Sequence, residues 1–146
     1  MSHPRSIRFE PTTETHLAAF AGRHPGLSLS GAAALLVDEG LRSDAHPGVV
    51  FRDGPAGRRA VVAGGPDVWE VVRAVRSARA AEPGLDSDEL LTVVSENTGV
   101  PSRYLRIAIA YYADYPDEVD EVMADADRAE QAAEIAAERQ RELLGS

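Results

Sequence analysis

The chain has 146 residues, 44% of them hydrophobic, no cysteine and a formal net charge of −9 at pH 7. This composition allows a packed core, and the lack of cysteine excludes disulfides, thiolate metal ligands and a cysteine nucleophile. The sequence contains no apolar run of about 18 residues that could span a membrane. Its first residues lead into a polar stretch rather than an apolar signal region, so a cytoplasmic protein is expected.

Charge is distributed unevenly along the chain. Residues 1–80 hold ten arginines and eight acidic residues, whereas residues 81–146 hold five arginines and sixteen acidic residues. A chain polarised in this way can place one end on phosphate groups and the other on a basic partner. A solvated acidic helix would produce the same pattern without a partner, so both interpretations stay open.

A short strand is predicted for residues 5–10, where Ile7 and Phe9 alternate with polar side chains. No neighbouring stretch could pair with this strand as a hairpin, and unpaired strand edges need a partner. If two copies of the chain pair these strands antiparallel, each strand gives the other the hydrogen-bonding partner that it lacks. We therefore predict a homodimer formed through this segment.

Two helices are predicted after the strand. The first has Thr12 or Thr13 as its N-cap and ends near residue 22, and the second is capped by Ser28 or Ser30. The second helix is expected over roughly 31–42, with its inward-facing residues being Ala33, Leu36, Val37 and Leu41.

A β-hairpin is predicted after a polar linker at residues 43–48. Two β-rich runs, 49–52 and 58–62, flank a five-residue loop that contains Gly and Pro. A helix is then expected over about 67–80, with Trp69 in the core.

Two further helices are expected on either side of a short turn. Asp86 or Ser87 caps a helix at about 88–97. Gly99 lies in the turn, and Pro101 suits the first position of the next helix. The two helices and the short glycine-containing turn between them form a helix-turn-helix arrangement. Together with the preceding hairpin, this arrangement suggests a winged-helix-like body.

The chain after Pro116 can stay helical to about Leu144. Its heptad seam consists mainly of alanine, which favours a helix but gives a weak coiled-coil interface. The predicted fold is mainly α with short β, in three parts: residues 1–43, 44–115 and 116–146. The seam residues are Val119, Val122, Ala126, Ala129, Ala133, Ala136, Gln140 and Leu143.

Residues 5–42 resemble the ribbon-helix-helix fold of CopG-type repressors. The resemblance lies in the Ser6-Ile7-Arg8-Phe9 strand, the Pro11-Thr12-Thr13-Glu14 helix start and the Gly26-Leu27-Ser28-Leu29-Ser30 approach to the second helix. It implies that paired strands enter the major groove of operator DNA. The DNA-binding residues implied are Arg5, Ser6 and Arg8, with Arg8 suited to guanine, and Ser28 and Ser30 near phosphate. Alternatively, Arg8 is only a surface residue and the serines are only caps.

Residues 45–118 resemble the small winged-helix domain of certain VapB-type antitoxins. The similarity lies in His46-Pro47-Gly48-Val49-Val50-Phe51, Gly65-Pro66-Asp67-Val68-Trp69 and Ala108-Ile109-Ala110-Tyr111-Tyr112-Ala113-Asp114-Tyr115-Pro116. It implies a type II toxin-antitoxin system, in which the chain neutralises a PIN-like ribonuclease toxin and represses its own operon. The alternative is a stand-alone dimeric transcriptional regulator without a toxin partner.

The long acidic helix is the expected toxin-binding element, through Val119, Val122, Met123 and Ala126. Arg103 and Arg106 share one helix face and are a possible second DNA contact; alternatively, they pair with Glu96 or the acidic helix. The sequence holds no nucleophile-and-base set, phosphate loop or metal-ligand spacing. We therefore expect no catalytic residues, no metal and no cofactor.

Overall fold

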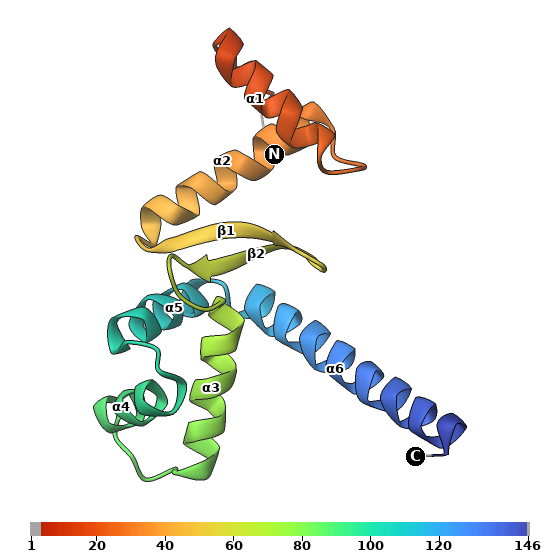
Figure 1. Cartoon of the computed structure of the whole chain (residues 1–146). Coiled ribbons are helices and arrows are strands. Elements are labelled where there is room, and N and C mark those ends of the chain that lie inside the picture. Colours follow the sequence, from red (N-terminus) through yellow and green to blue (C-terminus); the bar gives the residue numbers. More distant parts are fainter. Residues whose placement is uncertain (1–3, 146) are drawn as a thin grey trace. The chain divides into compact units, whose positions relative to one another are not determined.

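The structure is a computed structural model that describes residues 4–145 (Figure 1). Within this range the chain forms six helices and one two-stranded antiparallel hairpin, so the expected mainly helical fold with short strands is confirmed. No helix in the described range is both long and apolar enough to cross a membrane. The chain divides into two compact units, Met1–Arg42 and Ser43–Ser146, called here the first and the second unit.

The first unit contains an N-terminal segment, helix α1 (Pro11–Gly22) and most of helix α2 (Leu29–Ala45). Residues 4–10 lie in neither a helix nor a strand. The strand predicted at 5–10 is therefore not formed in the single chain.

Helix α1 begins one residue before the predicted caps. Glu10 is its N-cap residue and makes no capping hydrogen bond through its side chain, and Pro11 occupies the first turn. Proline suits that position because its φ angle is already helical and it has no N–H group to satisfy. The prediction of Thr12 or Thr13 as N-cap is wrong for this reason.

Helix α2 is longer than predicted at both ends. The Ser28 hydroxyl accepts a hydrogen bond from the backbone N–H of Gly31 at 3.0 Å, so Ser28 rather than Ser30 caps it. At its other end α2 continues to Ala45, through half of the predicted linker. Val37 and Leu41 are 53% and 66% exposed, so placing them in the core was wrong for the single chain.

The second unit begins with the hairpin of β1 (Val49–Gly54) and β2 (Gly57–Val62). The strands pair in register from Val49 opposite Val62 to Gly54 opposite Gly57, which leaves a two-residue turn. The predicted hairpin is confirmed, but its turn is tighter than the five residues expected. Gly57 has a φ angle of +111°, which other residues rarely adopt.

Four helices complete the second unit, and each predicted helix is confirmed to within about two residues. Asp86 forms a capping box with Glu89 at the start of the helix over Ser87–Thr98. Gly99 ends the same helix with a φ angle of +75°. The helices are α3 (Val68–Ala81), α4 (Ser87–Thr98), α5 (Ser102–Asp114) and α6 (Pro116–Leu144).

The core of the second unit lies between the hairpin and helices α3, α4 and α5, with the start of α6 packed on it (Figure 1). Trp69 is half-buried at the edge of this core rather than inside it. The largest fully buried side chains are Tyr111, Leu105, Val49, Val62, Val68 and Val94.

Only the first turns of α6 contribute buried side chains to the core of the second unit. Val119 and Met123 are 3% and 7% exposed, whereas the residues from Ala129 onward are exposed except for the half-buried Ala137. Val119, the first seam residue, is therefore buried together with Met123, one helical turn further along, whereas the seam residues from Ala129 onward are exposed.

Candidate DNA-binding and dimerisation surface

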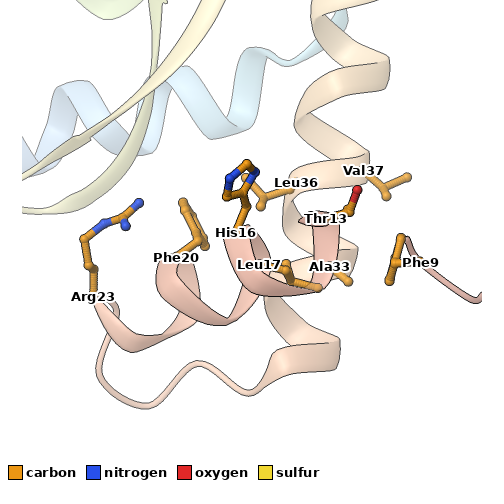
Figure 2. Close-up of a pocket in the computed structure, with 9 residues that line it drawn as sticks. All are labelled: Phe9, Thr13, His16, Leu17, Phe20, Arg23, Ala33, Leu36 and Val37. Atoms are coloured by element: carbon orange, nitrogen blue, oxygen red, sulfur yellow. The ribbon is translucent and has the colours of Figure 1, made fainter. Parts of the chain in front are cut away.

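An apolar hollow of about 420 Å³ opens on the first unit between α1 and α2 (Figure 2). Leu17 at its base is buried, but Phe20 and Leu36 are half-buried and Val37 is mostly exposed. Because these side chains stay open to water, the hollow is a surface that a partner could cover. Its lining residues are Phe9, Thr13, His16, Leu17, Phe20, Arg23, Ala33, Leu36 and Val37.

Further large apolar side chains of the first unit are open to solvent. Ile7, Leu29 and Leu41 are 70%, 51% and 66% exposed. When a small unit exposes several large apolar side chains, this surface is more often an interface with a partner than a surface that stays in solvent.

The predicted DNA-reading side chains are all exposed in the described structure. Arg5, Ser6 and Arg8 lie in the irregular segment before α1. Ser28 and Ser30 lie at the start of α2, where their hydroxyl oxygens are 3.4 Å apart. The Ser28 hydroxyl oxygen is already used as the cap of α2, so any phosphate contact there would use its hydroxyl hydrogen or free backbone N–H groups.

An aromatic cluster at the end of α1 was not predicted. The His24 ring stacks on Phe20 with centroids 4.1 Å apart, and His24 Nδ1 lies 2.7 Å from the backbone oxygen of Phe20. The Arg23 guanidinium lies 5.8 Å from the centre of the same ring. His24 lies beyond the end of α1, in the turn that follows Gly22, so helical spacing did not predict its contact with Phe20.

The possible second DNA contact lies on α5, where Arg103 and Arg106 are both exposed. Arg106 forms an ion pair with Asp88 of α4 at 2.9 Å. Arg103 instead lies over the ring of its neighbour Tyr104, at 4.7 Å. The expected pairing of these arginines with Glu96 or the acidic helix is therefore wrong, because α4 presents a different carboxylate to Arg106.

Two arginines of α3 hold the first half of α6. Arg73 forms ion pairs with Asp127 at 2.7 Å and Glu130 at 3.0 Å. The pKa of Arg73 is raised, mainly by its hydrogen bond with Glu130. Arg76 pairs in the same way with Asp120 at 2.9 Å. Sequence reasoning missed both contacts, although two arginines three residues apart on α3 were a signal for an acidic neighbour.

Tyrosines of α5 contribute to the same attachment. The buried Tyr111 donates a hydrogen bond from its hydroxyl to Glu118 at 2.7 Å, and Tyr112 donates to Asp120 at 3.0 Å. Desolvation, followed by the bond with Asp120, raises the pKa of Tyr112. Much of the acidic charge at the start of α6 is therefore used inside the second unit.

This arrangement corrects the predicted partner-binding residues. Val119 and Met123 are buried in the core of the second unit and cannot contact a partner while the unit is folded. Val122 and Ala126 are half-buried beside them. The error has a physical cause: the first turns of α6 find their apolar partner within the chain.

No group of three or more His, Asp or Glu side chains within residues 4–145 is placed to hold a metal ion. Compared with models of known protein families, with curated proteins and with solved structures, the chain matches none.

Proposed function

We propose that the chain acts as a homodimer whose first units pair as a ribbon-helix-helix DNA-binding head. The apolar hollow between α1 and α2 carries this proposal. A unit of this size that leaves a hollow open cannot bury enough apolar surface to be stable by itself. A second copy offers the same surface, so a two-fold pairing would cover both hollows at once. It would also give residues 5–10 a strand to pair with.

Sedimentation equilibrium tests this pairing with two single-charge variants. Val37→Glu places a carboxylate on the hollow and should convert a dimer into a monomer, because the charge would be buried without a partner. Ala19→Glu adds the same charge to an exposed position of α1 that does not line the hollow, and should leave the dimer intact. A monomeric wild-type chain at micromolar concentration, or equal dissociation of both variants, contradicts the proposal.

Paired N-terminal segments would carry Arg5, Ser6 and Arg8 of both copies side by side into the major groove of operator DNA. Support comes from the exposure of all three side chains in the described structure. Arg8 is the base-reading residue in this proposal, because its planar guanidinium can form two hydrogen bonds to guanine.

The second unit, in this proposal, is a winged-helix-like body that takes a protein partner. Residues 43–146 hold eleven arginines and twenty acidic residues, a balance that suits a basic surface such as a nuclease groove. The resemblance of residues 45–118 to VapB-type antitoxins gives the partner its class. The chain would then neutralise a PIN-like ribonuclease toxin and repress their shared operon.

Co-expression tests this part of the proposal. A PIN-like ribonuclease encoded beside the gene should arrest growth when expressed alone, and the wild-type chain should restore growth by forming a complex with it. Arg8→Ala should still restore growth while losing repression, since the two activities use different units. Failure of the wild-type chain to restore growth or to bind the ribonuclease overturns the antitoxin assignment.

One observation favours a stand-alone dimeric regulator as the second candidate. The α6 carboxylates of Asp120, Asp127 and Glu130 already pair with Arg73 and Arg76 of the same unit. Carboxylates used in this way contribute less to the attraction of a basic partner. The co-expression result separates the two candidates, because a stand-alone regulator would repress without neutralising a ribonuclease.

A further inference from the structure

A hollow of about 470 Å³ lies on the second unit between α3 and α6. It has no role in the proposed DNA contact. Its walls combine an aromatic ring with charged groups of both signs. The residues that line it are Trp69, Glu70, Arg73, Ala74 and Ser77 from α3, and Glu130 from α6.

Trp69 forms a fixed aromatic wall of this hollow. Its indole N–H donates a hydrogen bond to Asp67 at 3.1 Å, and Asp67 is held in turn by Arg59 at 2.6 Å. The guanidinium of Arg73 lies 4.7 Å from the centre of the Trp69 ring system. The hollow therefore already accommodates one guanidinium against this indole, the arrangement of a cation–π contact.

The charges around the hollow leave an excess of carboxylate. Arg73 is shared between Asp127 and Glu130, and Glu70 adds a third carboxylate that forms no ion pair with a described residue. Burial, followed by the nearby charge of Asp67, raises the pKa of Glu70, although Arg73 and Arg59 act in the opposite direction. An additional cation at this position would favour the charged form of that carboxylate.

We propose that this hollow binds an arginine side chain of a protein partner, which enters beside Trp69 and Arg73 and pairs with the carboxylates of Glu70 and Glu130. The proposal rests on the proposed function for the existence of that partner. Arginine fits better than lysine because its planar guanidinium holds five N–H donors in a fixed geometry that matches carboxylates and is less strongly hydrated than an ammonium group.

The fluorescence of Trp69, the chain's single tryptophan, reports directly on this hollow. The full-length chain is titrated with a blocked Gly-Arg-Gly peptide, and the same peptide with citrulline in place of arginine serves as the uncharged control. The arginine peptide should give a saturable change in emission, and the citrulline peptide should give none. Absence of a saturable change, or an equal change with citrulline, overturns the proposal.

Two matched variants locate the binding. Glu70→Gln should lower the affinity for the arginine peptide about tenfold, as expected when one hydrogen bond between charged groups is lost. Glu96→Gln removes the same charge from an exposed position of α4 that does not line the hollow, and should leave the affinity unchanged. Equal affinities of wild type and Glu70→Gln, or equal weakening in both variants, contradict the site.

Urea unfolding at pH 7 shows whether Glu70→Gln is folded. Because the pKa of Glu70 is raised in the folded chain, folding favours its protonated form, and the charge costs stability at neutral pH. The variant should therefore be at least as stable as wild type at pH 7, and this difference should vanish in acid, where Glu70 is protonated in both states.

The peptide titration needs neither DNA nor a toxin. A chain that binds the peptide yet neutralises no ribonuclease contradicts the proposed function alone, and the reverse result contradicts this site alone.

Discussion

Single side chains join the end of α5 to the elements around it. His46, at the approach to β1, lies with Nε2 2.7 Å from the Asp114 carboxylate, and the fully buried Tyr111 reaches Glu118 at the start of α6. A buried hydroxyl must be hydrogen-bonded to avoid a desolvation cost. Tyr111 therefore serves both as a core side chain and as a polar link between two helices.

Tyr111→Phe isolates the polar part of this role. Loss of the hydroxyl removes the bond to Glu118 and keeps the ring, so the free energy of unfolding should fall by about 1 kcal/mol. Urea denaturation followed by Trp69 fluorescence measures the change. Tyr104→Phe is the matched control, because the Tyr104 hydroxyl makes no hydrogen bond with a described residue. Equal effects of the two variants would show that the link to Glu118 contributes nothing.

Local signals at single residues explain which boundaries could be predicted. Asp86 was one of the two caps predicted for α4, and Pro101 was expected at the first position of α5, one residue from its observed place as the N-cap, because such signals act within one helical turn. The choice between Ser28 and Ser30 was open in the sequence, since both have the same chemistry and only the backbone path selects one. The alternation of Ile7 and Phe9 with polar residues predicted a half-buried strand, but in the single chain Ile7 is as open to solvent as Arg8, because no neighbouring strand covers it.

At the scale of elements, α6 consists of an attached half and a solvent-exposed half. Its helical range was predictable from residues 116–144 alone, but its buried face was not. The heptad pattern placed Val119 on one seam with Ala129 and the later alanines, whereas the structure buries Val119 together with Met123, which lies outside that seam. The hollow between α1 and α2 was equally out of reach of the sequence. Both depend on where other helices lie, which local periodicity does not encode.

Two truncations test this division of α6. A chain ending after Glu130 keeps the buried pair and the ion pairs with Arg73, so its free energy of unfolding should stay within about 0.5 kcal/mol of wild type. A chain ending after Tyr115 loses Val119 and Met123 from the core and should lose about 3 kcal/mol or more. Urea denaturation compares the two. Equal stability of both truncations would mean that α6 does not contribute to the core.

At the scale of the whole molecule, the two units differ in what they leave unsatisfied. The first unit exposes an apolar hollow, and the second carries all of the excess negative charge. Apolar exposure favours pairing between like surfaces, whereas uncompensated charge favours a partner of opposite charge. A dimeric DNA-binding head joined to a protein-binding body would give each unit a partner of the appropriate chemistry.

The most direct test of this account is the affinity of the chain for DNA from immediately upstream of its own reading frame. Fluorescence anisotropy at one fixed salt concentration compares wild type with Arg8→Ala and with Arg139→Ala, an exposed α6 arginine that forms no ion pair with a described residue. A dimer loses two base contacts when Arg8 is removed, each about 1–3 kcal/mol, so affinity should fall about thirtyfold or more. Arg139→Ala should bind as wild type does. Unchanged affinity of Arg8→Ala, or no specific binding by the wild-type chain, would contradict the account.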